Sequence, residues 1–435
     1  MTAQDLVEQA LMAEAEKSDL IEILFEKEVV NLSQSADQTL IEIKDVSSGE
    51  EQTLRAEYTI GADGPRSRTR NLIGSTLHAD PRDVLSQDVI FHADLKRYVT
   101  EDKQATLLYV VNAAGVVIFQ PLDGDSRWRC QITLAESEML SEDAVKERIR
   151  HALGTTDSVP MDIVSMGMWR PTPGCTDKFY DHRIFLAGDA AHISVPTGGM
   201  GNNTGFLGIR NLAWKLALVL NGWADQKILE SYEQEHRPIA LERIAFGVQT
   251  TEHMTEMIRN HVMGSPIEEA RQKTQQYADH DGVLLGYRVT SPLIAQSEDG
   301  IAPSEYEPQV YIPRVKPGHR APHIWLDEAS SVSLLDQFGA GFVLVIGAQL
   351  DHGTWKASAQ HLSRDGFPIR SIALQAEAPI YRSNELVLVR PDGVVSDCWA
   401  HDMLDLFADI SESEDFIPAL SQDLLERCRL RPADG

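Results

Sequence analysis

The amino-acid sequence predicts an α/β protein of several domains, with α+β elements. Three observations predict this class. An apolar strand that ends in a Gly-Asp or Gly-Ala-Asp turn occurs twice, at residues 53–64 and 183–189. A β-rich block lies between the two, from about 86 to 134, and helix and strand patterns alternate again after about 310. Strand-turn-helix units favour a parallel sheet, whereas consecutive strands with short turns favour an inserted antiparallel sheet.

Composition narrows the classes of function. A chain of 435 residues has room for about three domains. The formal charge of −27 disfavours nucleic acids and anionic membranes as partners. No apolar run reaches the ~18 residues that span a bilayer, and residues 1–20 resemble an acidic helix more than a signal peptide. The four cysteines, Cys130, Cys175, Cys398 and Cys428, form no CxxC pair, so we expect reduced thiols, no metal site and a cytoplasmic location.

In the first half of the chain, apolar residues from Leu6 to Ala13 recur near helical spacing. Ile21, Ile23 and Phe25 then alternate as in a half-buried strand. Further strands are predicted at 39–44 and 53–60, the second running into the turn GADGPRSR and a short helix. The stretches TLLYVVN and GVVIFQPL, separated by Ala-Ala-Gly, predict a hairpin of the inserted sheet.

In the second half, a strand at 183–187 leads through a glycine-rich loop into a long helix from about 203 to 221. Its apolar residues surround the helix, which predicts burial on all sides, and Gly222 suits a left-handed residue past its end. Helical sequence continues to about 275, with a break predicted at Pro238. After a proline-containing linker from about 310, VSLLDQFGAGFVLVIGA, FPIRSIAL and ELVLVRPDGVV predict a small α/β domain.

Residues 61–70, Gly-Ala-Asp-Gly-Pro-Arg-Ser-Arg-Thr-Arg, place a carboxylate where a strand gives way to a helix. Ligands bind at the carboxyl ends of parallel strands, and flanking glycines allow a cofactor to approach the backbone. Taken alone, the segment is better explained as a tight turn before a solvated basic helix start.

Residues 183–205 carry a more specific signal. The strand ends at Gly188-Asp189, and four glycines within eight residues precede the long helix. Such a loop exposes backbone N–H groups, and the positive end of the helix dipole favours an anion or an electron-rich carbonyl. His192, a single histidine beside the turn, is interpreted as a structural residue.

Together the two segments resemble the second and third FAD-contacting motifs of class A flavoprotein monooxygenases, the single-component, para-hydroxybenzoate hydroxylase-like enzymes. The resemblance includes FLAGDAAH, PTGG, NTG and NLAWKL, and in the family, as here, the two motifs stand over a hundred residues apart. Residues 229–238 resemble the continuation of the third motif. The tail from about 310 resembles the thioredoxin-like domain of the phenol hydroxylase group, without a redox CxxC.

The resemblance implies roles for particular residues. Asp189 would accept a hydrogen bond from a ribityl hydroxyl, Asp63 would stand near the flavin and the nicotinamide path, and Pro196 would lie against the isoalloxazine ring. Backbone N–H groups of residues 201–204 would face its N1 and O2 side. The predicted cofactor-binding residues are Asp63, Gly64, Arg66, Gly188, Asp189, Pro196, Gly199, Gly201, Asn202, Asn203 and Thr204. No catalytic residue or general base is assigned.

The resemblance also implies a reaction. NADPH, or NADH, reduces FAD, molecular oxygen adds at the flavin C4a position, and the hydroperoxide hydroxylates a small phenolic or polyketide aromatic substrate. The block from 86 to 134, with Met166, Met168 and Trp169, is the expected substrate wall, although each of these three residues is as readily explained as core. The sequence leaves a homodimer open.

The implied architecture is an incomplete FAD-binding Rossmann-like domain with an inserted antiparallel β-sheet substrate domain and a thioredoxin-like α/β domain at the C-terminus. We expect a partial FAD-binding domain at 1–85 and a β-rich substrate domain at 86–170. The rest of the FAD-binding domain and the long helices would occupy 171–305, and the thioredoxin-like domain 306–435.

Two departures from the family pattern leave alternatives open. The sequence has no GxGxxG, so we expect a chain truncated at its N-terminus. Gly208 stands where an aspartate is expected, which weakens the helix by roughly 0.5–1 kcal/mol relative to alanine. One alternative is therefore a catalytically inactive homologue that acts as a partner or regulatory protein. A flavoprotein that performs dehydrogenation or epoxidation is another.

Overall fold

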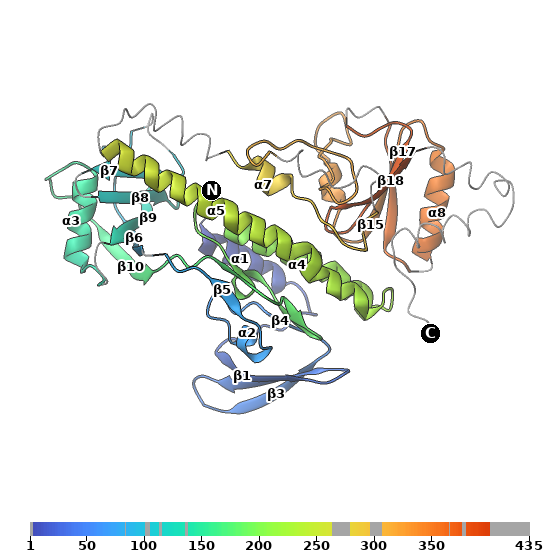
Figure 1. The fold of residues 1–435 in the computed structure, drawn as a ribbon, viewed down its shortest axis with the longest axis horizontal. Coiled ribbons are helices and arrows are strands. Elements are labelled where there is room, and N and C mark those ends of the chain that lie inside the picture. The colour runs from blue at the N-terminus through green and yellow to red at the C-terminus, as the bar shows by residue number, and fades with distance from the viewer. Residues whose placement is uncertain are drawn as a thin grey trace. The chain divides into compact units, whose positions relative to one another are not determined.

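The structure is a computed structural model that describes residues 3–82, 84–100, 105–112, 115–134, 138–262, 279–295, 307–364, 366–375 and 380–400. The chain forms two compact units, each assembled from separated stretches of sequence (Figure 1). The first contains Met1–Glu57, Ala79–Pro173 and Thr251–Lys273, and the second contains Tyr58–His78, Gly174–Thr250 and Thr274–Gly435. The domain boundaries proposed from the sequence stay predictions.

The first unit opens with helix α1 (Gln4–Ala15) and a three-stranded antiparallel sheet of β1 (Lys27–Gln34), β2 (Thr39–Asp45) and β3 (Glu51–Ala56). The strand predicted at residues 21–25 is wrong, because no described strand pairs with it and its apolar side chains are exposed, Phe25 by 69%. The strand predicted at 53–60 is in fact two, β3 and β4 (Thr59–Gly61), which belong to different sheets.

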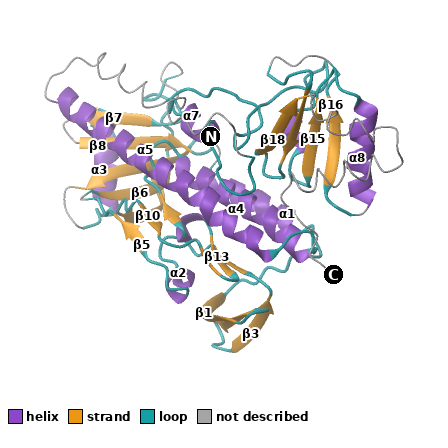
Figure 2. Cartoon of the chain, turned by 45° about the vertical axis from the view of Figure 1, so that its right-hand side comes forward, coloured by secondary structure: helices purple, strands orange, loops and turns teal. Residues whose placement is uncertain are grey.

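The inserted antiparallel sheet predicted from the β-rich block is confirmed. Its strand order is β10-β6-β9-β8-β7, and every pairing is antiparallel. Helix α3 (Glu142–Ala152) covers one face and buries Val145 and Ile149 against the sheet (Figure 2). Met166 also packs against this core. The strands are β6 (Leu85–His92), β7 (Leu108–Asn112), β8 (Gly115–Pro121), β9 (Arg127–Leu134) and β10 (Asp162–Trp169).

Two small sheets of short strands organise the second unit. In one, β13 (Ile184–Leu186) lies between β12 (Tyr180–Asp181) and β4; the other has the order β14-β11-β5. The remaining short elements are α2 (Arg68–Leu72), β5 (Leu77–Ala79), β11 (Gly174–Thr176), the 3-10 helix η2 (Gly188–Ala190) and β14 (His192–Ile193). Both Gly-Asp segments therefore lie in this unit.

Two long helices, α4 (Met200–Leu220) and α5 (Ser231–Val262), lie side by side and are joined through the 3-10 helix η3 (Gln226–Glu230) (Figure 1). Gly222 has the predicted left-handed conformation, with a φ of 73°. The prediction that α4 is buried on all sides is wrong. Some of its apolar side chains are exposed to solvent, and Phe206 is 56% exposed. No described helix is both long enough and apolar enough to cross a membrane.

The break predicted at Pro238 is also wrong, because α5 continues through this residue. A proline inside a helix lacks one hydrogen-bond donor and crowds the preceding turn, at a cost of about 3 kcal/mol. Burial of Tyr232, Ile239 and Ala240 on both sides of the proline offsets this cost. The predicted end of the helical sequence, near 275, lies outside the described residues.

The C-terminal part of the second unit is a four-stranded sheet with the order β16-β15-β17-β18. β15 (Phe342–Ile346) and β16 (Ile369–Ala373) are parallel and are connected by helix α8 (His352–Arg364), which flanks the sheet (Figure 2). β17 (Glu385–Val389) and β18 (Val395–Ala400) form an antiparallel hairpin. The predicted α/β block is confirmed, and its kinship to thioredoxin stays a prediction. Two short helices, α7 (Asp281–Leu285) and η5 (Leu334–Gln337), precede β15.

Candidate cofactor site

The two Gly-Asp segments meet because β4 and β13 are parallel neighbours. Ile184 pairs with Thr59 and Leu186 with Gly61, and the backbone N–H of Ala187 donates to the Gly61 carbonyl over 2.9 Å. Both strands therefore deliver their turns at the same edge of the sheet. The carboxyl edge of parallel strands is where α/β proteins bind ligands. The structure thus unites two segments that are over a hundred residues apart in the sequence.

The carboxylate of Asp63 is held by its own turn. It accepts hydrogen bonds from Ser67 Oγ, from the backbone N–H of Thr69 over 2.9 Å and from Thr69 Oγ1 over 3.0 Å. Burial raises the pKa of Asp63, but these hydrogen bonds outweigh burial and hold its pKa below the usual value. Gly61 is required here, because a Cβ on it would lie 2.5 Å from Thr69 Cγ2. Asp63 is therefore an anion that also organises the start of α2.

Arg70 connects the two turns. Its guanidinium is buried and donates to the Ala190 carbonyl over 3.1 Å and to the Pro65 carbonyl over 2.8 Å. The basic start of α2 is thus not wholly solvated, although Arg66 and Arg68 are exposed. Sequence reasoning did not single out Arg70, because three arginines in five residues give no sign of which one turns inward.

Asp189 contrasts with Asp63. Gly188 has a φ of 57°, and the Asp189 carboxylate forms no hydrogen bond within the described residues. The surrounding protein removes part of its hydration, which raises the pKa of Asp189. Gly205 of α4 approaches closely, since a Cβ on it would lie 3.4 Å from Gly188 Cα. A carboxylate with unused acceptor capacity at this edge fits a ligand that carries hydroxyl groups.

The N-terminus of α4 opens beside this carboxylate. Gly198 and Gly199 have φ values of 82° and 63°, and no side chain caps the first turn. The side-chain amide of Asn203 donates to the Gly199 carbonyl over 2.9 Å. Because no side chain accepts from the first turn, its N–H groups are available to a ligand. Nearby, Ser194 Oγ is buried and has no hydrogen-bond partner in the described chain. The residues present therefore fit a polar, partly anionic cofactor.

The remaining predicted residues are distributed around this edge. Pro196, Asn202 and Asn203 are exposed, whereas Thr204 is fully buried. Thr204 Oγ1 donates to the Met200 carbonyl over 2.7 Å and accepts from Arg243 over 3.2 Å, so its hydroxyl is already hydrogen-bonded within the protein. Gly64 has a φ of 77° in the turn after Asp63. The individual cofactor contacts stay predictions.

Gly208 makes space for a buried histidine pair. A Cβ on Gly208 would lie 2.4 Å from His236 Nε2, and His236 Nε2 lies 3.2 Å from His192 Nε2. Burial lowers the pKa of His192 to about 4 and that of His236 well below its usual value, so both are neutral and one tautomer donates to the other. His192 is thus buried against another histidine, and its structural role stays a prediction. The glycine that departs from the family pattern has a packing reason.

A buried ionic network joins α4, α5 and the C-terminal sheet. Arg390 donates to both carboxylate oxygens of Glu235 over 2.8 Å, and Lys215 donates to the same carboxylate over 2.8 Å. Asn211 bridges Glu235 and Asp392 over 2.6 and 3.1 Å. Burial lowers the pKa of Lys215 to about 8, against the opposing effect of Glu235. The only sequence signal for this network is a lysine within the apolar run NLAWKLAL.

Comparison with known proteins agrees with this geometry. Residues 1–246 match the family described as "FAD binding domain", and residues 314–414 match "Aromatic-ring hydroxylase, C-terminal". The chain is 32% identical to aklavinone 12-hydroxylase DnrF of Streptomyces peucetius, over 82% of this chain and 70% of the relative. It is 29% identical to 4-methyl-5-nitrocatechol 5-monooxygenase of a Burkholderia species, over 91% and 74%.

Among solved structures, the chain resembles aklavinone-11 hydroxylase in complex with FAD and aklavinone. The TM-score is 0.79 at 26% identity, and the alignment covers 98% of this chain and 78% of that protein. Its likeness to the flavin-dependent monooxygenase PieE, with a TM-score of 0.82 at 23% identity, concerns the fold alone. The coverage is 98% of this chain and 79% of PieE.

Proposed function

The chain belongs to the family of FAD-dependent aromatic-ring hydroxylases, and on that premise we propose that it hydroxylates a phenolic or polyketide aromatic ring. The observation that carries the proposal is the shared edge of β4 and β13, where an unpaired carboxylate stands beside an uncapped helix N-terminus. The net reaction consumes the aromatic substrate, O2, NAD(P)H and a proton. It yields the hydroxylated ring, NAD(P)+ and water.

FAD, when bound, supplies the redox chemistry by accepting a hydride from NAD(P)H and activating O2. In our proposal the Asp189 carboxylate accepts a hydrogen bond from a ribityl hydroxyl and thereby fixes the sugar chain. The N–H groups of residues 201–204 would lie toward the electron-rich edge of the cofactor. Their partial positive charge, together with the α4 dipole, would favour negative charge on the cofactor at this edge.

Asp63 has a different proposed role. Since Ser67 and Thr69 already occupy much of its acceptor capacity, we propose that it shapes the turn beside the nicotinamide path more than it binds the cofactor. Arg66, which is exposed next to it, is the proposed contact for a negatively charged part of FAD or NAD(P)H. The choice between NADPH and NADH stays open to measurement.

The inactive-homologue alternative loses one of its arguments. Gly208 provides the space that His236 occupies, so the glycine does not indicate a loss of function in α4. The compared relatives, moreover, are named as monooxygenases and hydroxylases. The aromatic compounds in these two names, 4-methyl-5-nitrocatechol and aklavinone, are therefore chosen as test substrates.

The test is an NADPH oxidation assay with FAD, in the presence and absence of 4-methyl-5-nitrocatechol or aklavinone. We expect an aromatic substrate to accelerate NADPH oxidation and one atom of 18O2 to enter the product. Product oxygen derived only from H2 18O would overturn the proposal, and product without incorporated oxygen would favour the dehydrogenase alternative. A variant with Asp162→Ala, an exposed residue of β10, serves as the control.

The proposal includes a cytoplasmic location. Cys130, Cys175 and Cys398 are free thiols, which suits a reducing compartment. Cys428 lies outside the described residues. Sedimentation analysis decides between a monomer and the homodimer.

A further inference from the structure

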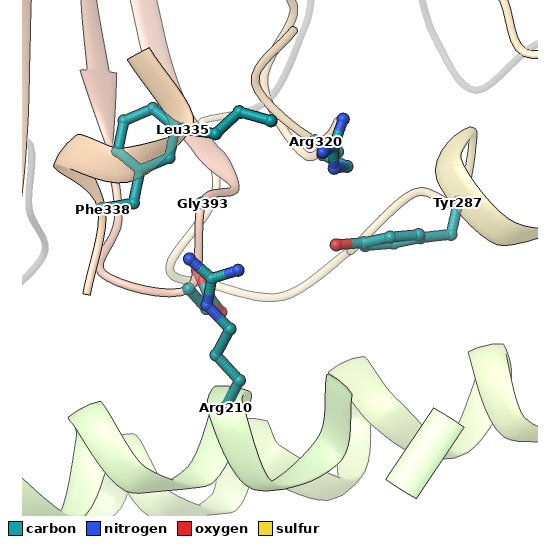
Figure 3. A pocket seen from close by; sticks show the side chains of 7 residues that line it. Arg210, Tyr287, Arg320, Leu335, Phe338 and Gly393 are labelled. Carbon is teal, nitrogen blue, oxygen red and sulfur yellow. The ribbon is translucent and has the colours of Figure 1, made fainter. Parts of the chain in front are cut away.

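A small cavity in the second unit lies apart from the cofactor edge. It has a volume of about 40 Å³ and forms between α4, the segment around residue 320 and the β17–β18 turn. At roughly 10–15 Å³ per water, this is room for about three waters, or for one small oxyanion. Figure 3 shows Arg210 rising from α4 on one side, Arg320 opposite, and the Tyr287 hydroxyl pointing inward. The lining residues are Arg210, Tyr287, Arg320, Leu335, Phe338, Asp392 and Gly393.

The two arginines carry charge that the described chain does not neutralise. Neither guanidinium forms an ion pair or a side-chain hydrogen bond within the described residues, and no hydrogen bond of the Tyr287 hydroxyl is found there either. The Tyr287 ring is itself buried, and the Arg243 guanidinium lies 5.6 Å from its centre. The side chains of Arg210, Arg320 and Tyr287 therefore bring three hydrogen-bond donors to one cavity, and none of them has an acceptor within the described residues.

Asp392, the one carboxylate in the lining, is already satisfied. It accepts from Arg390 Nε over 3.1 Å, Trp214 Nε1 over 3.2 Å and Asn211 over 3.1 Å. In this buried network the charges of Arg390 and Lys215 balance those of Asp392 and Glu235. The charges of Arg210 and Arg320 are therefore a local surplus.

His319, next to Arg320 in the chain, also feels nearby positive charges. Burial, followed by the charges of Arg288, Arg314 and Lys316, lowers the pKa of His319 to about 4. The whole chain carries a formal charge of −27, so a cationic cavity is no consequence of general basicity. The planar guanidinium forks of arginine match phosphate and carboxylate oxygens in geometry.

We propose that this cavity binds a small oxyanion, phosphate or a carboxylate, between Arg210, Arg320 and the Tyr287 hydroxyl. Arg210 extends over Gly393, whose φ of 80° forms the tight β17–β18 turn. A bound oxyanion therefore links α4 to the C-terminal sheet. Since α4 begins at the cofactor edge nearly three turns before Arg210, a bound anion would also stabilise the position of that helix. The proposal does not rest on the proposed function.

The test is isothermal titration of the full chain with inorganic phosphate, acetate and chloride at constant ionic strength. We expect saturable binding of phosphate or acetate but not of chloride, and the stronger of the two identifies the oxyanion class. Arg210→Gln and Arg320→Gln should each weaken binding at least ten-fold, because each removes a charge-assisted contact. Arg364→Gln, which changes an exposed arginine at the end of α8, should leave it unchanged.

Thermal unfolding provides the second measurement. The oxyanion should raise the melting temperature of the wild-type chain and of the Arg364→Gln variant, but not that of the Arg210→Gln variant. Because Arg210 is exposed, its variant should fold, which a circular dichroism spectrum without added anion verifies. No saturable binding, binding equal to that of chloride, or an unchanged affinity in both cavity variants would overturn the proposal.

Discussion

The two Gly-Asp segments end neighbouring parallel strands, yet their carboxylates are in opposite states. Asp63 is held by Ser67 and Thr69 and has a lowered pKa, whereas Asp189 has no described partner and a raised pKa. The contrast teaches that position at a strand end does not by itself make a carboxylate available to a ligand. The donors within each turn decide whether the carboxylate organises the chain or remains free for a cofactor.

The largest difference in the free energy of unfolding is expected between alanine variants of the glycines in the two turns. Gly61→Ala would place a Cβ 2.5 Å from Thr69 Cγ2, whereas a Cβ on Gly188 meets no atom within 4 Å. We expect Gly61→Ala to lower the free energy of unfolding by about 3 kcal/mol, since Thr69 must move. Gly188→Ala should lower it by only about 1–2 kcal/mol, through its left-handed backbone. Urea denaturation measures both free energies of unfolding. Equal losses in the two variants would contradict the difference between the two turns.

A second difference concerns Asp63 itself. Asp63→Ala removes the acceptor of the Ser67 hydroxyl and of the Thr69 N–H, both in a buried part of the turn. We expect a loss of about 2 kcal/mol in the free energy of unfolding without FAD, because the donors are left unpaired. Asp189→Ala should change it by less than about 0.5 kcal/mol. If the two variants lose the same stability, Asp63 is no more structural than Asp189.

The smallest effect is in the pH dependence of stability. The lowered pKa of Asp63 gives stability that is present above the usual value of 3.8 and is lost as pH falls through its folded pKa. The raised pKa of Asp189 acts in the opposite direction, so its charged form destabilises the fold at neutral pH.

Asp189→Asn should therefore raise the free energy of unfolding at pH 7, by no more than about 0.5 kcal/mol. The gain should fade as pH falls through the raised pKa of Asp189, where the wild-type carboxyl is protonated. Asp63→Asn should instead lower stability at pH 7, and this deficit should shrink in acid. Urea titrations at several pH values measure both curves, and curves of the same sign would show that the two environments do not differ.

The sequence predicted the parts of the site that depend on local pattern. Glycine density from Gly198 to Gly205 indicated an open helix N-terminus, and the uncapped first turn of α4 agrees with it. Alternation predicted the inserted sheet, in which β7, β8 and β9 are neighbours that also follow each other in the chain. The same alternation failed at residues 21–25, where no partner strand is described. An alternating pattern therefore indicates a strand only where the fold also provides a partner for it.

Partners distant in the chain could not be predicted. Glu235 and Arg390 are 155 residues apart, and neither segment indicates that the other neutralises it. The break predicted at Pro238 ignored the burial on both sides of the proline, which is a tertiary effect. Gly208 was interpreted as a weakness, because its contact with His236 is invisible in a single sequence.

FAD affinity tests the central claim most directly, namely that the Asp189 carboxylate is kept free for the cofactor. Titration of the protein with FAD, followed by quenching of flavin fluorescence, gives the dissociation constant for the wild-type chain, Asp189→Ala and the control Asp162→Ala. Loss of a charge-assisted hydrogen bond of about 1.5–3 kcal/mol should weaken FAD binding roughly ten- to a hundred-fold in Asp189→Ala. The control should match the wild type. Equal dissociation constants for all three proteins would contradict the assignment of Asp189 to the cofactor.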